Sequence, residues 1–528
     1  MPAAADRQRA MTDRPMQPTV HAAAEQASGN RGADLVERIP AGRAARILAF
    51  SAGAGLLAQL LFVGQQPGIN LGLWVSAVLG AALLTRRPDA SLDRLDAWLP
   101  LAALTFGWLP ALRDDLSLQL FNVPAAAGLT LASTVAMGGQ PVTRLAGRLV
   151  AQLGIVASAM AVFGGFLLGH GFNPRVGSLG RGRLMAPLLR SLLIALPLLV
   201  IFVALFSAAD AVFSTQLAAL THLGVDVSEL TRRLLFATAA GWLFAGAMVA
   251  AWLPRPAAQP EATAQTAGPR LGALEATLVL LILDAAFAAF VLLQLAYLFG
   301  GLDTLAVSGL TYAEYARRGF FELMAVAVIV GLVLAAFSHL VGERTRAYRG
   351  AAVALAVLTG FVLLSAAYRL GLYQAAYGWT ELRLYVLAMI SWLGIGLFVA
   401  IVGLAIDRRR WLAHAVVGSA LAIAVVVNLV GPHAFVTERN LERAINPALV
   451  APGGHSGLDT DYLEYLGADA VPAMVAALPR LTPAAAADLR RILRRTATQL
   501  RQEAAGAGWP SWSYSRHRAL EVLAEAGY

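Results

Sequence analysis

Charged side chains stand at the ends of four apolar segments of this chain, where they could bind a ligand or hold helices together. They are Asp210, Glu322, Arg369 and Arg383. A carboxylate pairs well with the planar guanidinium of arginine, because two parallel hydrogen bonds can form. The sequence therefore predicts one polar cluster at these segment ends. Ion pairs that fix the helices are one interpretation, an outward-facing ligand pocket is a second, and independent interface anchors are a third.

The stretch YAEYARRGFFEL, residues 312–323, supplies further members of this cluster. On a helix, Tyr315, Arg318 and Glu322 share one face, because they are spaced i, i+3 and i+7. Tyr and Arg at a helix end are also ordinary membrane-interface anchors. Glu322 lies inside the apolar run, where an ionised carboxylate needs a partner. The full predicted cluster comprises Asp210, Tyr315, Arg317, Arg318, Glu322, Arg369, Tyr373 and Arg383.

A second polar set lies deeper in an apolar segment. Asp284 is near the middle of the run 273–299, and Gln294 is near its end. A charge at the centre of a bilayer costs about 2.5–3.5 kcal/mol on insertion scales, so such residues usually face the interior of a helix bundle. Asp284 could couple the protein to protons or ions, or it could hydrogen-bond neighbouring helices together. Gln294 fits an interhelical hydrogen bond.

Other chemistry receives little support. The chain has no Cys, and its His residues have no zinc-ligand spacing. The Gly-rich stretch 165–183 lacks the pattern of a nucleotide-binding loop, and no GxSxG marks a nucleophile. We therefore predict no catalytic residue, no metal and no cofactor. The net charge of +9 is explained by arginine-rich loops on one side of a membrane, so it predicts no nucleic-acid partner.

The composition predicts that membrane helices position these groups. Of the 528 residues, 58% are hydrophobic and only 14% are charged, whereas soluble domains carry roughly 25% charged residues. Several apolar runs approach or exceed the ~18 residues that mark a spanning helix. The fold class is therefore all-α, a polytopic bundle with the lipid bilayer as its partner. The eleven predicted spans are 44–63, 69–85, 97–112, 116–137, 188–209, 233–253, 273–299, 320–340, 351–370, 383–405 and 412–431.

The charges of the loops predict the topology, and they also predict whether one ambiguous run crosses the membrane. Short loops rich in Arg stay in the cytoplasm, and three such clusters share one side if the N-terminus is inside; they are Arg86–Arg94, Arg344–Arg349 and Arg408–Arg410. The run 149–168 has Arg residues on both flanks, so we expect it not to cross, although a twelve-span chain is the alternative. Loops 64–68, 113–115 and 371–382, the predicted polar cluster and the C-terminus then lie outside.

The chain divides into three parts. Residues 1–43 are polar, which predicts a disordered cytoplasmic tail. They contain no apolar region of the kind found in a signal peptide. Residues 44–431 form the transmembrane domain. Residues 432–528 are polar and punctuated by prolines, and the patterns between the prolines are those of amphipathic helices. We predict a small C-terminal, extracytoplasmic helical domain.

Several stretches resemble a bacterial family of multi-pass membrane proteins that is catalogued only as a domain of unknown function. YAEYARRGFFEL is similar to its signature. Four further stretches resemble other parts of the family: 193–213, 294–301, 365–385 with its YGWTELR motif, and the tail 458–472; NLERA at 440–444 also matches the family's tail. The resemblance covers roughly residues 190–475. It implies a membrane topology but no activity.

Three function classes remain. We favour a non-enzymatic membrane protein, a sensor, scaffold or accessory protein, with an extracytoplasmic ligand or protein partner. A secondary transporter that uses intramembrane carboxylates is the first alternative, although no internal repeat supports it. A membrane enzyme that acts on a lipid-linked substrate is the second, because clusters of carboxylates and arginines can perform such chemistry.

Overall fold

The computed structural model describes residues 41–86, 88, 90–139, 142, 227–250, 272–299, 320–341, 344–406, 412–451, 454 and 457–528. Every regular element in these residues is a helix, as the composition predicts. The predicted span 188–209, the ambiguous run 149–168 and residues 1–40 of the N-terminal tail lie outside the described residues. Each other predicted span coincides with a helix, although the boundaries differ by several residues.

The first group of apolar helices comes mainly from the N-terminal part of the chain. It contains α3 (Ala41–Phe62), α4 (Ile69–Thr85), α5 (Leu99–Trp108) continued by η1 (Leu109–Ala111), α6 (Leu116–Met137) and α10 (Val227–Ala250). Short connections make α3, α4, α5 and α6 neighbours, and α10 packs along α3. Their core is apolar, with Val75, Ala103 and Phe106 almost fully buried.

Two glycines let α3 and α10 approach closely. A Cβ on Gly55 would collide with the carbonyl oxygen of Ala237, and a Cβ on Gly241 would lie 2.8 Å from the carbonyl oxygen of Ser51. Small residues at such crossings allow helix backbones to touch, which is a common basis of helix packing in membranes. The close contact explains why these two helices, far apart in the sequence, form one pair.

Gly55→Val should therefore lower the stability of the bundle by about 2 kcal/mol or more, because the added carbons meet backbone that can only move by separating the helices. Gly53 lies in the same helix, and a Cβ added there would meet no heavy atom within 4 Å, so Gly53→Val is the matched control and should be nearly neutral. Thermal unfolding of the two variants in detergent measures the difference. Equal melting temperatures would contradict the close packing.

The second group of apolar helices forms its own core. It contains α11 (Ala273–Phe299), α14 (Phe320–Leu340), α15 (Arg346–Tyr377), α16 (Glu381–Ile406) and α17 (Leu412–Val430). α15 packs against α11, α14 and α16. α17 joins the two groups, since Leu421, Ala424 and Val425 pack on the core of the first group. Asn122 of α6 and Asn428 of α17 exchange hydrogen bonds of 2.8 and 3.1 Å between their side chains at this junction.

The outer faces of these helices are apolar, as expected of helices in lipid. Leu101, Leu116, Leu274 and Ile282 each expose 69–73% of their surface. Four helices of the described residues, α6, α11 through Leu292, α15 and α16, are long and apolar enough to cross a membrane, and a bent pair, α17 and α18, makes a fifth if it is counted as one span. Other apolar helices are shorter. The protein is thus a helical membrane protein, and the count of eleven spans stays a prediction.

The helices after Gly431 form a cap with a third apolar core. It contains α18 (Pro432–Ile445), η3 (Pro447–Leu449), α19 (Thr460–Tyr465), α20 (Gly467–Ala477), η4 (Leu478–Arg480), α21 (Pro483–Gly506), η5 (Trp509–Ser511) and α22 (Tyr514–Glu525). In α21, buried Leu489, Ile492, Leu493 and Leu500 recur at helical spacing. The chain bends by 54° between α17 and α18, at Gly431, whose φ of +70° favours glycine.

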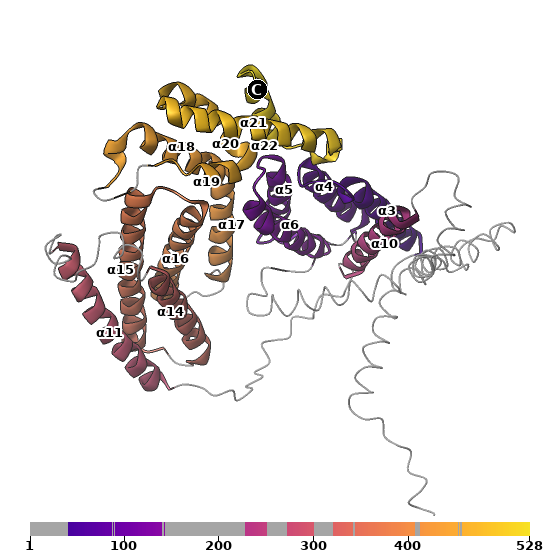
Figure 1. Ribbon diagram of the computed structural model, residues 1–528. Helices are drawn as coiled ribbons and strands as arrows, with labels where there is room; N and C mark the ends of the chain where they lie inside the picture. Colours follow the sequence, from indigo (N-terminus) through magenta and orange to yellow (C-terminus); the bar gives the residue numbers. More distant parts are fainter. Residues whose placement is uncertain are drawn as a thin grey trace, which may run out of the picture.

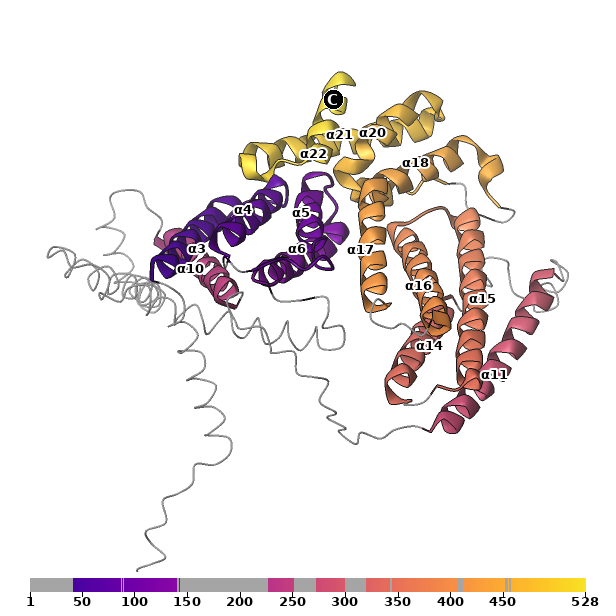
Figure 2. The same cartoon turned by 180° about the vertical axis from the view of Figure 1, so that it is seen from behind.

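The cap closes one end of the membrane helices. Figures 1 and 2 show α18–α22, in orange to yellow, lying across the ends of α4, α5, α16 and α17. The opposite end of the second group carries Arg344, in the loop before α15, and Arg346, the first residue of α15. The cap therefore lies at the end of the bundle where α15 finishes, one 32-residue helix away from that arginine cluster.

Candidate functional site

The loop between α3 and α4 is the first of three that bind the cap. The Oγ of Ser511 donates a hydrogen bond to Oε1 of Gln65 at 2.8 Å and accepts one from the backbone N–H of Gln66 at 2.9 Å. The N–H of Ile69 donates to the carbonyl oxygen of Trp512 at 3.0 Å. A Cβ on Gly68 would lie 2.5 Å from that carbonyl oxygen. The backbone of the cap thus lies directly on this loop.

Arg113, in the loop before α6, is the second attachment. Its Nη1 lies 3.2 Å from Oδ1 of Asp469 in the first turn of α20, and its Nε and Nη2 donate to the carbonyl oxygens of Asn428 and Leu429 at 2.9 and 2.7 Å. These carbonyls belong to the last turn of α17, where no intrahelical donor remains. One guanidinium therefore joins three elements, and a Cβ on Gly431 would collide with it.

Asp114, beside Arg113, extends this attachment to the last helix. Arg516 of α22 donates from Nη1 to Oδ1 of Asp114 at 2.6 Å. Burial raises the pKa of the Asp114 carboxyl, while Arg516 opposes the rise and Asp469 adds to it. The backbone N–H of Asp114 donates to Oδ2 of Asp469 at 3.2 Å. The carboxylates here are thus balanced by Arg113 and Arg516.

The third attachment is the turn between α15 and α16. Asn440 of α18 accepts from the N–H of Trp379 and donates to its carbonyl oxygen, both at 2.8 Å. The guanidinium of Arg443 donates to the carbonyl oxygens of Gln374, Ala375 and Ala376, at the C-terminal end of α15. The Asn-x-x-Arg of NLERA therefore binds the YGWTELR motif at Trp379 and, through Arg443, the three residues just before that motif.

Three side chains that could share a ligand meet between these attachments. Asp115 precedes α6, Glu381 begins α16 and His433 lies in the first turn of α18. Nε2 of His433 is 2.9 Å from Oε2 of Glu381 and 3.5 Å from Oδ2 of Asp115. The side chain of Asp115 is 0% exposed, that of His433 is 7% exposed and that of Glu381 is 15% exposed. We call this group the boundary cluster.

Local structure fixes each member of the boundary cluster. Asp115 is the N-cap of α6, and its Oδ1 accepts from the N–H groups of Ser117 and Leu118, as aspartate at this position prefers. This leaves Oδ2 to face His433 and to accept from the hydroxyl of Tyr385 at 3.2 Å. His433 follows Pro432, a residue suited to the first position of a helix.

Tyrosines of α19 adjoin the boundary cluster. The hydroxyl of Tyr462 accepts from the N–H of Glu381 at 2.8 Å, and the ring of Tyr465 lies 6.1 Å from that of His433. Burial raises the pKa of Tyr462 to about 12, and the charge of Glu381 raises the pKa of Tyr465. Both hydroxyls therefore stay protonated near neutral pH. Burial also raises the pKa of Asp115; His433 opposes the rise and the charge of Glu381 adds to it.

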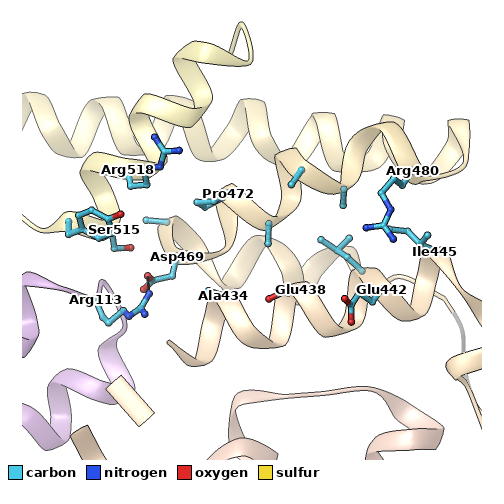
Figure 3. Close-up of a pocket in the computed structure, with 16 residues that line it drawn as sticks. Arg113, Ala434, Glu438, Glu442, Ile445, Asp469, Pro472, Arg480, Ser515 and Arg518 are labelled. Carbon is cyan, nitrogen blue, oxygen red and sulfur yellow. Dashed lines mark hydrogen bonds and ion pairs between the residues drawn. The ribbon is translucent and has the colours of Figure 1, made fainter. Parts of the chain in front are cut away.

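A cleft of about 480 Å³ opens in the cap, between α18, α20 and α22. Its floor is formed mainly by small apolar side chains, and charged side chains stand around it. Figure 3 shows Arg113, Asp469 and Arg518 at one end and Glu442 and Arg480 at the other. Such a mixture of apolar floor and a few charged groups is typical of binding sites.

The structure brings only some of the predicted cluster together. The guanidinium of Arg383 lies 4.0 Å from the centre of the Tyr373 ring and donates to the carbonyl oxygen of Gly378. Arg369 is half-buried one turn before Tyr373 on α15. The remaining members are not described: Asp210, Tyr315, Arg317 and Arg318 lie outside the described residues, as does the side chain of Glu322. The convergence of the whole predicted cluster stays a prediction.

Asp284 lies half-buried on α11, and its Oδ1 makes no hydrogen bond within the described part of the chain. The side chain of Gln294 lies outside the described residues. If Asp284 only holds helices together, Asp284→Asn should insert normally and change stability by less than about 1 kcal/mol, since interhelical hydrogen bonds in membranes are weak. Membrane level and melting temperature measure this. Normal insertion with complete loss of a cellular phenotype would instead support ion coupling.

The spacing of Asp115, Glu381 and His433 along the chain does not predict the boundary cluster. Its three members come from separate elements, and only the docking of α18 brings His433 to the two carboxylates. Two local signals existed: Asp115 stands where a helix N-cap is expected, and Gly431-Pro432 marks the start of a new helix. Neither signal reveals that these helix starts meet.

Residues 101–477, more than half of the chain, match the profile of a family described as "Domain of unknown function (DUF4153)". The match confirms the resemblance noted in the sequence and begins earlier in the chain than the stretches that carried it. It includes the boundary cluster and the first helices of the cap. No curated protein and no solved structure matches the chain.

Proposed function

The chain belongs to the family described as "Domain of unknown function (DUF4153)", and on that premise we propose that it is a non-enzymatic receptor or accessory protein of a bacterial inner membrane. Its extracytoplasmic cap binds a segment of a partner protein in the cleft between α18, α20 and α22. The observation that carries this proposal is a one-sided cleft with unpaired charges on a cap that is firmly attached to the membrane helices.

The charges around the cleft support a ligand of mixed polarity. Glu438 and Arg480 line it and form no ion pair with the described residues. Arg518 and Glu442 line it as well, but each already pairs with a neighbour on its own helix. The unpaired charges favour a peptide that carries one basic and one acidic side chain, placed against Glu438 and Arg480.

The floor of the cleft supports small apolar contacts from the same peptide. Ala434, Ala473 and Ala477 leave room above the helices, and Leu441 and Pro472 provide larger apolar surface. A volume of about 480 Å³ holds a few side chains and falls within the range of ligand sites, roughly 300–1,000 Å³. A short segment of a protein partner fits these dimensions.

The arrangement of loops and helices supports an extracytoplasmic cap. The loops that bind the cap contain Gln65, Arg113 and Trp379, and they share one end of the bundle. Arg344, in the loop before α15, and Arg346, the first residue of α15, stand at the other end of that helix. Because arginine-rich short loops remain in the cytoplasm, the cap takes the opposite side.

Photo-cross-linking in living cells tests the proposal. A photoreactive amino acid at Glu438 should give a defined adduct with one protein, whereas the same probe at Arg494, an exposed residue of α21 outside the cleft, should not. Arg480→Glu should reduce the Glu438 adduct by about tenfold, the effect of ~1.4 kcal/mol. Equal labelling from both positions, or an adduct indifferent to Arg480→Glu, would contradict a binding role for the cleft.

A further inference from the structure

We propose that Asp115, Glu381 and His433 bind one divalent transition-metal ion, for which Zn²⁺ has the matching chemistry. This inference concerns the boundary cluster beneath the cap and goes beyond the proposed role of the cleft. The ion would join α6, α16 and α18 directly, and would thereby connect the cap to two helices of the membrane bundle.

The donor atoms have suitable types and positions. Zn²⁺ binds imidazole nitrogen and carboxylate oxygen at about 2.0–2.2 Å, so donor atoms in a tetrahedral site lie roughly 3.3–3.6 Å apart. In the boundary cluster the three donor atoms all lie within 4.8 Å of one another, with Nε2 of His433 at 2.9 and 3.5 Å from the two carboxylate oxygens. Small side-chain rotations would place all three around one ion.

The contacts of the two ring nitrogens of His433 are compatible with a bound ion. An Nε2–H can donate one good hydrogen bond, yet two carboxylate oxygens face it. Nδ1, on the other side of this nearly buried ring, is itself buried and has no hydrogen-bond partner among the described residues. The contacts of Nδ1 therefore do not determine which ring nitrogen carries the proton. The lone pair of Nε2 can bind an ion that both carboxylates bind as well.

The charge balance favours a cation at the same point. Two carboxylates lie together with little exposure, and burial of such charges is unfavourable unless an opposite charge compensates them. Nε2 of His433 lies within 3.5 Å of both carboxylates. A divalent ion would balance both carboxylates and leave the imidazole neutral. This distinguishes the boundary cluster from the neighbouring Asp114 and Asp469, which arginines already balance.

Three protein donors leave one position of a tetrahedral zinc ion for a further ligand. Three protein donors and an open position are typical of catalytic zinc sites, whereas structural sites usually have four protein donors. The hydroxyl of Tyr385 donates to Oδ2 of Asp115 and can orient that carboxylate. The hydroxyl of Tyr462 accepts from the backbone N–H of Glu381 and so fixes the start of α16. Tyr465, beside His433, is 61% exposed and marks the side on which solvent approaches.

Titration of the purified full-length chain with Co²⁺, after chelation and dialysis, tests the site. Wild type should bind one equivalent and show the visible absorption of a low-symmetry Co²⁺ centre. His433→Gln and Glu381→Gln should weaken binding by more than about 100-fold, since even groups that only orient metal ligands contribute roughly 10–100-fold. His517→Gln is the control, because His517 pairs with Glu521 on the exposed surface of the same cap; it should bind like wild type.

A second readout separates loss of the site from loss of the fold. Zn²⁺ should raise the unfolding temperature of the wild type and of His517→Gln, and it should leave the two ligand variants unchanged while their caps remain protease-resistant. If a ligand variant does not fold, Co²⁺ binding and the Zn²⁺-dependent unfolding temperature of the wild type decide whether the site exists. A wild-type chain that neither binds one Co²⁺ nor responds to Zn²⁺ would overturn the proposal, as would equal binding by folded His433→Gln.

Discussion

Arg113→Ala should detach the cap from the membrane helices. The substitution leaves Asp469, whose side chain is 3% exposed, without its ion-pair partner, and it removes two donors from the last turn of α17. Removing one partner of a buried ion pair costs roughly 3–5 kcal/mol. We expect the cap to become sensitive to protease at temperatures where the wild type resists. Limited proteolysis of the detergent-solubilised chain over a temperature series measures this.

A matched control and a second-site change make the Arg113 result specific. Arg491→Ala removes an arginine of the same cap whose side chain is 65% exposed in its ion pair with Asp488. Surface pairs contribute about 0–1 kcal/mol, so this variant should resemble wild type. Asp469→Asn, added to Arg113→Ala, should restore part of the resistance because it removes the uncompensated charge. Identical behaviour of Arg113→Ala and Arg491→Ala would refute the anchoring role.

Arg443→Ala should have an effect of similar size at the third attachment. Arg443 is 8% exposed, and its loss removes a charged donor from the carbonyl oxygens of Gln374, Ala375 and Ala376 at the end of α15. The N–H groups of Gly378 and Ala451 still donate to the first two. Hydrogen bonds from a charged donor contribute about 1.5–3 kcal/mol each, so we expect a loss of roughly 3 kcal/mol. Arg443→Lys should recover little, because an ammonium lacks the planar fork that reaches several acceptors.

The same helix provides the control for Arg443. Arg439, one turn earlier, is half-exposed and pairs with Glu442 on the surface. Arg439→Ala should therefore change the unfolding temperature much less than Arg443→Ala. Thermal unfolding of the three variants in one detergent compares them. A fully stable Arg443→Ala would mean that α15 ends without help from the cap.

Apolar runs made the membrane helices predictable. A run such as 383–405 must satisfy its backbone within itself in lipid, so a helix follows from composition alone. The prolines of the tail similarly mark helix starts, as Pro432 and Pro483 do in α18 and α21. The loop charges placed on one side of the membrane the helix ends that the structure shows beneath the cap. Which side of the membrane this is remains a prediction.

The candidate site was much less predictable, for a physical reason. Arg443 and Asn440 look like ordinary surface residues of an amphipathic helix, and only their docking onto α15 and Trp379 gives them buried partners. The boundary cluster depends on the same docking. The start of a helix can be predicted from the residues around it. Which helix starts meet in the folded protein depends on how the three apolar cores pack together.

Cysteine cross-linking in intact cells tests the central claim, that the C-terminal helices close over the extracytoplasmic ends of the membrane helices. The chain has no cysteine, so Gln65→Cys with Ser511→Cys introduces one defined pair at a contact of 2.8 Å between the native side chains. A protease site inserted in the stretch 254–270 separates the two halves after lysis. With a short, membrane-impermeant bis-maleimide, the halves should stay joined in the double variant and separate in each single variant. Halves that separate in the double variant, although both cysteines react after the membrane is opened, would contradict the account.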